Sequence, residues 1–508
     1  MSRNSLTGII AAALPVITFS VLGQVPGNEL SRQRWFEIRS PHFNTYSCGA
    51  TQDVARLVAR LEQFREAYAQ MAGTQAVASP PVVVMAFSEL AAMKPFLPLY
   101  QGQPANLVAF FDHGSDENLI AMPLSGAGQR PFEIIYHEYT HLLLRHNDRF
   151  WPIWLKEGMA DIYSTFEVTG SHTARIGQPM QPYLHLLENE PLQPLNQLFA
   201  VTRDSPQYNE RERQGIFYAE SWLLAHYLML GNNPERKARF GQLTALLRQG
   251  QLPEQAFTNT FHCGWQTIQQ ELQAYLKRGH FVPLELGIRS DLNAPWGLVT
   301  RWIAPPEASF RLGDQLMRVG RLDEAAGLFS QAQAQAPGSP FGYEGLGLLA
   351  GVRHQPEEAA NFLHEALQRG SRSFLAHFAY ARARFQLTAD PQGRYKTLPQ
   401  DLAAEIRTEL ERSLALMLDF GPAHHLLGIL QLLQHEDLQM AQQHLERAIR
   451  LEPENSSYLL SLAQAQQIRN EPVAAKRTLE QLRLPYVGTE LRTQAEQMLQ
   501  DLARDAHP

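Results

Sequence analysis

The amino-acid sequence predicts an α+β domain followed by an all-α domain built from repeated helix pairs. Between residues 35 and 122, short apolar runs alternate with a stretch whose apolar residues recur every three or four positions. From residue 306 onward, small and large apolar residues instead recur at a step of 34 residues. A chain of 508 residues is long enough to bury more than one hydrophobic core, as this division requires.

The charge balance and the cysteine content exclude several classes of protein. The chain carries 44 Lys and Arg against 51 Asp and Glu, a formal net charge of -7, without long runs of like charge. This balance argues against a surface that neutralises phosphates, so no nucleic-acid partner is expected. Cys48 and Cys263 are the only cysteines, too few for a thiolate zinc cage or a disulfide scaffold. They form either one disulfide bridge or two buried free thiols.

Residues 1–23 are predicted to be a signal peptide. Arg3 precedes a mostly apolar run from Leu6 to Leu22, and small residues at its end suit a signal peptidase. We therefore expect an exported protein, periplasmic or secreted if bacterial, with an uncleaved N-terminal anchor as the minor alternative. No later segment is apolar enough to cross a bilayer, so no membrane span is expected once the signal is removed.

Residues 24–130 are predicted to form the N-terminal part of the α+β domain. Ser40-Pro41 divides Trp35–Ser47 into two short strands, because proline cannot donate to a β-ladder. The segment Thr51–Met71 is predicted to be a helix with one apolar stripe, made of Val54, Leu57, Val58, Leu61, Phe64 and Tyr68. Three further strands are expected, at Val82–Phe87, Leu107–Phe111 and Asn118–Met122.

The sequence His137-Glu138-Tyr139-Thr140-His141 matches the pattern H-E-x-x-H within a stretch compatible with a helix. The two histidines lie one helical turn apart, so both imidazoles leave the same face and can reach one cation. Glu138 is rotated by about 100° from His137, which lets its carboxylate face a metal-bound water without binding the metal. Zinc held by imidazole and carboxylate lowers the pKa of such a water towards about 7, and the glutamate can then take its proton.

A second helix is predicted to open at Pro152 and to carry Glu157 and Asp161, which are also four residues apart. This spacing directs both carboxylates to one side of the helix. Glu157 can complete the protein ligands of the metal, and Asp161 can accept the outer N–H of a ligating histidine and fix its tautomer. An ordinary amphipathic helix with an acidic surface pair is the alternative.

Together, His137–His141 and Trp154–Asp161 resemble the gluzincin branch of the zincin metallopeptidases, specifically its peptidase-MA-like domains. The resemblance covers roughly residues 35 to 279 and implies a zincin-like fold whose catalytic part spans residues 131–288. It also implies Zn2+ bound by His137, His141 and Glu157, with Glu138 as the general base. The spacing between His141 and Glu157 is a few residues shorter than in thermolysin-like and aminopeptidase branches.

Tyr218 opens a segment, Tyr218-Ala219-Glu220-Ser221, that resembles the Y-x-x-S sequence found after the zinc motif in peptidase-MA-like domains. Its hydroxyl can donate to an oxyanion developing beside the metal, so Tyr218 is a candidate catalytic residue. A buried tyrosine with a neighbouring hydrogen-bond partner is the alternative. His226, on the same predicted helix, is expected to be a structural histidine.

Residues 289–305 contain turn residues without a sustained period and are predicted to be a linker. Residues 306–508 resemble tetratricopeptide repeats. A small residue and a large apolar residue, Ala325 and Phe329, recur 34 positions later as Ala359 and Leu363. Such repeats stack as a solenoid of helix pairs with a concave surface. A less regular stretch, Leu387 to Asp419, is expected to hold a degenerate repeat with an enlarged turn.

These observations favour an exported zinc metallopeptidase that hydrolyses peptide bonds in a protein or peptide substrate. The solenoid is expected to recruit this substrate or a protein partner at its groove. The alternative is a non-catalytic protein-binding scaffold that retains the zincin-like domain for its structure. Two further expectations follow for the enzyme: Asn118–Met122 is an edge strand lining the cleft, and a chain ending near Asp291 folds without the repeats.

Overall fold

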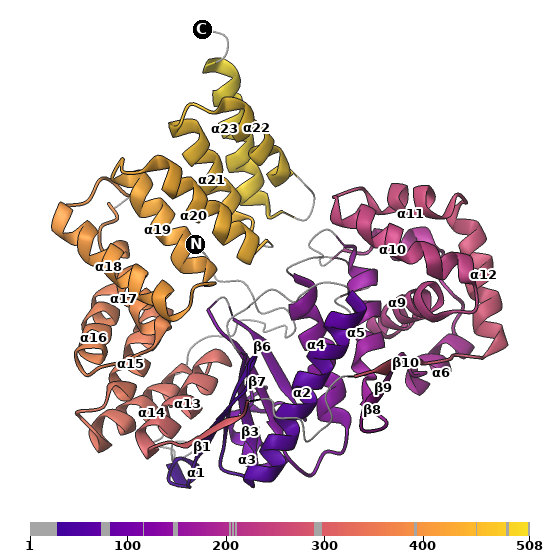
Figure 1. Ribbon diagram of the computed structural model, residues 1–508, viewed down its shortest axis with the longest axis horizontal. Coiled ribbons are helices and arrows are strands. Elements are labelled where there is room, and N and C mark those ends of the chain that lie inside the picture. Colours follow the sequence, from indigo (N-terminus) through magenta and orange to yellow (C-terminus); the bar gives the residue numbers. More distant parts are fainter. Residues whose placement is uncertain are drawn as a thin grey trace.

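The structure is a computed structural model in which an α+β part and a curved array of helices lie side by side (Figure 1). It describes residues 28–72, 82–114, 116–145, 151–202, 205, 208, 211–288, 297–390, 394–453, 455–483 and 487–505. The predicted signal peptide, residues 1–23, lies outside these ranges. Among the described helices, none combines the length and the apolar character needed to cross a membrane.

A six-stranded mixed sheet forms the centre of the α+β part. Its strand order is β11-β1-β2-β3-β7-β6, in which β2, β3 and β7 are parallel and the other neighbours are antiparallel. The strands are β1 (Phe36–Arg39), β2 (Phe43–Ser47), β3 (Val82–Phe87), β6 (Phe110–His113), β7 (Asn118–Pro123) and β11 (Val299–Trp302). The predicted strands within Trp35–Ser47 and at Val82–Phe87 and Asn118–Met122 are therefore confirmed, whereas the strand predicted at Leu107–Phe111 is displaced to Phe110–His113.

The two faces of the sheet belong to different hydrophobic cores. Val82, Val84 and Ala86 on β3 pack with α2 (Thr51–Ala72) and α4 (Arg130–Arg145). The alternate residues Val83, Met85 and Phe87 pack instead with the first helices of the C-terminal array (Figure 1). Every residue of β3 is buried, as expected for a central parallel strand covered on both faces.

The remaining helices of the first part form one group, which packs on α5 (Ile153–Ser164) through its longest member, α9. They are α6 (Gln181–Asn189), α7 (Leu195–Ala200), α9 (Arg211–Leu230), α10 (Pro234–Arg248), α11 (Pro253–Phe261) and α12 (Trp265–Arg278). A small sheet is formed by β8 (Glu167–Val168), β9 (Thr173–Ile176) and β10 (Leu284–Gly287). Short elements complete this part: α1 (Asn28–Ser31), α3 (Leu90–Met93), η1 (Lys94–Phe96), β4 (Leu99–Tyr100) and β5 (Gln103–Pro104).

The C-terminal part is a helical-repeat solenoid, as the sequence predicts. Its helices pair in order: α13 (Pro305–Arg318) with α14 (Leu322–Gln335), α15 (Pro340–Val352) with α16 (Pro356–Gln368), α17 (Phe374–Gln386) with α18 (Gln400–Leu416), α19 (Gly421–Leu433) with α20 (Leu438–Leu451), and α21 (Ser457–Ile468) with α22 (Pro472–Glu480). The turn η2 (Gln481–Arg483) and helix α23 (Thr489–Asp505) follow. The stretch Leu387–Asp419 does not hold a whole repeat, because it contains only the second helix of the pair α17–α18, and the partner α17 ends at Gln386.

The predicted linker, 289–305, is not only a connection. Residues 289–296 lie outside the described part, but Val299–Trp302 forms strand β11, which pairs with β1 along its whole length. All four residues of β11 are exposed, because the strand lies at the edge of the sheet. A four-residue edge strand without buried positions leaves no periodic pattern in the sequence, which explains why the sequence predicts only a linker here.

Two further expectations need correction or resolution. The segment Asn118–Met122 is not an edge strand, because β7 pairs with β3 on one side and with β6 on the other. The edge beside α4 is formed by β6 instead. Cys48 and Cys263 are free thiols that pack against different cores, so the disulfide alternative does not hold in this structure.

Candidate metal centre

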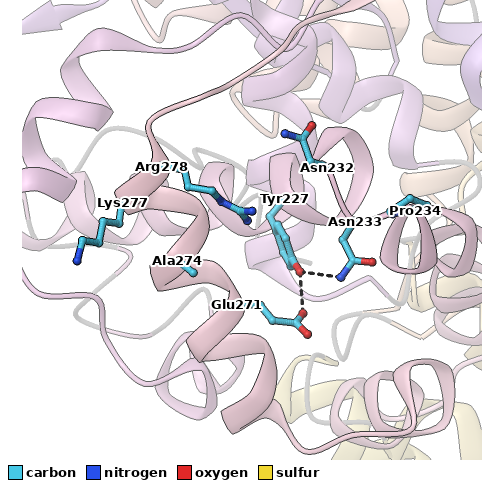
Figure 2. Close-up of a pocket in the computed structure, with 8 residues that line it drawn as sticks. All are labelled: Tyr227, Asn232, Asn233, Pro234, Glu271, Ala274, Lys277 and Arg278. Atoms are coloured by element: carbon cyan, nitrogen blue, oxygen red, sulfur yellow. Dashed lines mark hydrogen bonds between the residues drawn. The ribbon is translucent and has the colours of Figure 1, made fainter.

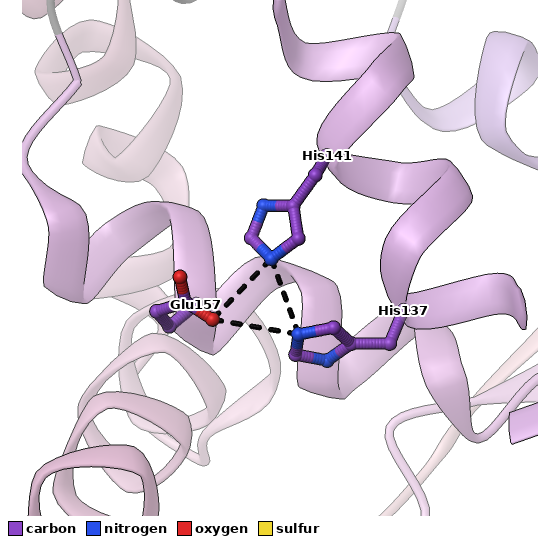
Figure 3. Close-up of side chains that lie close together, drawn as sticks. All are labelled: His137, His141 and Glu157. Carbon is purple, nitrogen blue, oxygen red and sulfur yellow. Dashed lines mark hydrogen bonds and ion pairs between the residues drawn. The ribbon is translucent and has the colours of Figure 1, made fainter. Parts of the chain in front are cut away.

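Helices α4 and α5 bring three potential metal ligands together (Figure 3). His137 and His141 leave the same face of α4, and their Nε2 atoms are 3.1 Å apart. The Oε2 atom of Glu157 on α5 lies 3.4 Å from Nε2 of His137 and 3.3 Å from Nε2 of His141. Glu157 is buried, whereas both histidines are partly exposed, so solvent reaches the group from the histidine side.

The three atoms suit one zinc ion in both chemistry and spacing. Two imidazole nitrogens and one carboxylate oxygen are the donor set of many catalytic zinc sites. Donors at 2.0–2.1 Å from zinc on the corners of a tetrahedron lie about 3.3–3.4 Å from one another. The observed separations of 3.1, 3.3 and 3.4 Å are close to this value and leave the fourth corner to a non-protein ligand.

Asp161 holds His137 in the orientation that metal binding requires. Its Oδ1 atom lies 2.9 Å from Nδ1 of His137, one helical turn after Glu157 on α5. If Nδ1 carries the proton, Nε2 keeps its lone pair for the cation. The other carboxylate oxygen of Asp161 accepts a hydrogen bond of 3.1 Å from the hydroxyl of Tyr183 on α6. Sequence reasoning missed Tyr183, because nothing in the sequence indicates that α6 returns to this site.

A close contact between α5 and α9 places Glu157. A methyl group at Gly158 would lie 2.3 Å from the backbone oxygen of Ser221 and 2.8 Å from the side chain of Ala225. Only glycine therefore allows the two helices to approach this closely. Tyr208, which precedes α9 in the sequence, donates a hydrogen bond of 3.2 Å to Oε1 of Glu157.

The carboxylate of Glu157 is ionised despite its burial. Burial by itself raises the pKa of this group, but the charges of His141 and His137 and their hydrogen bonds lower it more. The net result is a pKa far below the ordinary value of 4.5. A bound divalent cation would replace these imidazolium charges, because both histidines must be neutral to bind it while the carboxylate stays ionised.

Glu138 faces a histidine that sequence reasoning did not single out. Oε2 of Glu138 lies 3.4 Å from Nε2 of His113, the last residue of edge strand β6. Burial raises the pKa of Glu138, but the hydrogen bond to His113 and the nearby charges of His137 and His141 lower it to about 2. Glu138 is therefore ionised at neutral pH, which is the state that a proton acceptor requires. His113 lies just beyond the predicted strand Leu107–Phe111, so its approach to α4 depends on the sheet.

Tyr218 lies on α9, near Glu157 but stacked on another tyrosine. Its ring centroid is 6.2 Å from that of Tyr208, and the two ring planes are inclined by 30°. Burial raises the pKa of Tyr218, and the charge of Glu157 and the neighbouring Tyr208 raise it further. Its hydroxyl is therefore a hydrogen-bond donor at neutral pH. His226, on the same helix, is confirmed as structural, because its ring contacts Tyr275 and the backbone oxygen of Gly177, each at 2.9 Å.

A separate pocket of about 710 Å³ lies among α9, α10 and α12 (Figure 2). Tyr227 in its wall donates a 2.7 Å hydrogen bond to Glu271, which also pairs with Arg236. The lining residues are Tyr227, Asn232, Asn233, Pro234, Glu271, Ala274, Lys277 and Arg278. None of the metal-centre residues lines it, so it plays no part in the chemistry considered below.

No protein-family model and no curated protein matches the chain. Among solved structures, a thermophilic TPR protein of Thermus thermophilus is 20% identical and covers 38% of this chain and 98% of its own, with a TM-score of 0.30. YrrB, a TPR protein with an unusual peptide-binding site, is 14% identical and covers 37% and 91%, with a TM-score of 0.31. PilF of Pseudomonas aeruginosa is 18% identical and covers 39% and 87%, with a TM-score of 0.31. The helix pairs of this chain, rather than these matches, establish the solenoid.

Proposed function

We propose that the chain is a zinc-dependent metallopeptidase with a zincin-like catalytic domain and a solenoid for binding protein. The observation that carries the proposal is the donor triangle of His137, His141 and Glu157, with the ionised Glu138 on the same helix. A domain that held zinc only for its structure would have no chemical need for this fourth, non-ligating carboxylate.

Zinc, when bound, supplies a Lewis acid that polarises a carbonyl group and acidifies a coordinated water. Glu138 takes the proton from the attacking water and returns it to the leaving nitrogen. His113 holds the carboxylate of Glu138, and Asp161 holds the ring of His137 through its Nδ1 atom. Tyr218, protonated at neutral pH, is a donor for the developing oxyanion.

A peptide is the substrate class that the site favours. Strand β6 ends the sheet and packs against α4, so an extended peptide can add to its free edge and pass along the metal centre. Backbone pairing of this kind reads the shape of the substrate more than its sequence. The proposed location is outside the cytoplasm, in the periplasm or the medium of a bacterial source, which rests on the N-terminal apolar run alone.

The solenoid supplies a binding surface in this proposal. Helix α13 is almost entirely buried, because it packs on the sheet, so the partner surface is expected on later repeats. Stacked helix pairs form a concave face that suits an extended segment or a helix of another protein.

The test separates metal binding from proton transfer. Glu138→Gln removes the proton acceptor and keeps the ligands, so zinc content should stay at about one ion per chain. Hydrolysis of a library of unstructured peptides should fall at least about a hundredfold. Glu133→Gln is the matched control, because Glu133 lies exposed on the same helix and should change neither quantity. Equal turnover by metal-replete wild type and Glu138→Gln would contradict the mechanism.

The second candidate is a non-catalytic protein-binding scaffold. It is favoured by the core that the sheet shares with the repeats, since a domain built into the solenoid can serve as its cap. Zinc binding without hydrolysis of any library peptide, in wild type and Glu138→Gln alike, would support this scaffold over the enzyme.

A further inference from the structure

The turn between β6 and β7 is held by the first repeat helix. Arg318, at the end of α13, donates from Nη1 to Oδ2 of Asp112 at 3.4 Å and to the backbone oxygen of Glu117 at 3.0 Å. The same nitrogen lies 3.7 Å from the carboxylate of Asp116, and Nη2 lies 3.5 Å from that of Glu117. Nε donates to Asp314 on α13 itself at 3.0 Å.

Arg318 contacts every carboxylate of this cluster, and Arg311 adds a second positive charge that acts on Glu117 and Asp314. The side chain of Arg318 is only 8% exposed, and four carboxylates surround it. Gly114, in the same turn, lies close to the guanidinium of Arg318. A methyl group at this position would be 2.7 Å from Nη1 of Arg318. Removing the guanidinium would leave several buried negative charges without their common partner.

Strand β6 connects this cluster to the metal centre. Asp112 and His113 are consecutive in the strand, and consecutive side chains of a strand point to opposite faces of the sheet. Asp112 accordingly contacts Arg318 of the solenoid, whereas His113 lies 3.4 Å from Glu138 on α4. On the face of the sheet that carries His113, the ring of Phe111 lies 4.4 Å from the imidazole, whereas Arg318 holds the strand from the opposite face through Asp112.

We propose that Arg318 is a positioning residue of the hydrolytic site, acting through Asp112 and strand β6 on His113 and thereby on Glu138. The inference rests on the proposed function. It makes the first repeat a component of the catalytic apparatus instead of a separate recruitment module. A partner that shifts α13 would therefore shift the contact between His113 and Glu138.

The experiment is a double-mutant cycle on the zinc-loaded full chain, with an unstructured peptide as substrate. Arg318→Lys keeps the charge and loses the planar fork of donors, and we expect it to lower kcat between about tenfold and a hundredfold, as misplacement of catalytic groups does. KM and zinc content should not change. In a His113→Ala background, the same Arg318→Lys substitution should change kcat less than about twofold, because its effect is transmitted through His113.

Two controls keep the result interpretable. Arg384→Lys makes the same substitution at a partly exposed ion pair, with Glu405 in a later repeat, and should leave kcat unchanged. Asp112→Asn breaks the same link from the strand side and should reproduce Arg318→Lys. Hydrogen exchange, read by mass spectrometry on full-length protein, should quicken in the peptide that contains β6 and stay constant in α4. This readout does not depend on turnover.

The outcomes separate the two proposals. An active wild type with equal kcat losses in both backgrounds, or with no loss in Arg318→Lys, would overturn the positioning role and leave the proposed function intact. A wild type that hydrolyses nothing would overturn both. Unchanged exchange at β6 in Arg318→Lys and Asp112→Asn would also overturn the positioning role, whatever the kinetics.

Discussion

Arg301 donates from Nε to Oε2 of Glu37 across 2.5 Å, although 264 positions separate the two residues in the chain. Glu37 is fully buried in β1, and Arg301 lies on β11, within the segment that the sequence marks as a linker. The other end of the same guanidinium pairs with Glu307 at the start of α13. The sheet is therefore completed by the chain that leads into the solenoid, and the two parts are mutually dependent for their stability.

The first prediction corrects the expectation that a chain ending near Asp291 folds alone. Such a chain lacks β11 and α13, so it would expose the sheet face that carries Val83, Met85 and Phe87. We expect it to aggregate or to melt well below the full-length protein. A chain ending at Gly370 keeps α13 to α16 and should remain folded and bind zinc. Thermal melting, light scattering and zinc analysis of both chains provide the check.

Equal melting temperatures of the full-length protein and the chain ending at Asp291 would show that the core shared by the sheet and the repeats contributes little to the stability of the α+β part. The short chain would then be a free-standing domain, and the repeats a module that is only attached to it.

The second prediction concerns the metal. His141→Ala removes one of three donors and opens the triangle, so the purified protein should lose most of its zinc. His185→Ala is the control, because His185 is an exposed histidine on another helix and should leave the zinc content unchanged. Elemental analysis after dialysis against a weak chelator measures both. The same zinc content in His141→Ala and wild type would remove His141 from the ligand set.

The third prediction tests the close approach of α5 and α9. Gly158→Ala would place a methyl against the backbone oxygen of Ser221, and backbone cannot move aside as a flexible side chain can. We expect a loss of about 1–3 kcal/mol in unfolding free energy and weaker zinc binding, because Glu157 follows the helix. Gly241→Ala on α10 meets open space and should leave stability equal or slightly higher.

Urea unfolding curves and a chelator competition assay supply the two measurements. Gly158→Ala with unchanged stability and zinc affinity would mean that the helices separate at no cost, contrary to the packing described above.

The fourth prediction is a pH dependence of stability. Burial raises the pKa of Glu117 to about 7, with Arg318 and Arg311 lowering it and Asp314 and Asp116 raising it. Between the ordinary value of 4.5 and about 7 the folded protein therefore binds more protons at this site than the unfolded chain. Stability contributed by this group is therefore present at low pH and is lost as the pH rises from the ordinary value towards about 7.

Glu117→Gln removes this loss, so its melting temperature should exceed that of wild type by more at pH 8 than at pH 5. Glu490→Gln, at an exposed position of α23, controls for the change in net charge. If the melting temperatures of Glu117→Gln and wild type differ by the same amount at both pH values, the raised pKa assigned to Glu117 is contradicted.

Local sequence patterns are sufficient to predict many of the helices of this protein and the placement of its metal-ligand pairs. The helical stripe from Val54 to Tyr68 requires one face to be buried, and the 34-residue step defines helix pairs, because both signals arise from neighbours along the chain. The spacing of His137 and His141, and of Glu157 and Asp161, likewise places each pair on one helical face before any tertiary contact is known.

The tertiary structure alone decides which distant groups meet. Tyr183 reaches Asp161 and His113 reaches Glu138 through helix packing and sheet order, and neither depends on a spacing that can be read along the chain. The same holds for β11, whose exposed residues gain their role only from pairing with β1. Strand pairing and long-range ion pairs are contacts between segments far apart in sequence, so their partners are selected by the folded chain as a whole, as Arg318 and Asp112 illustrate.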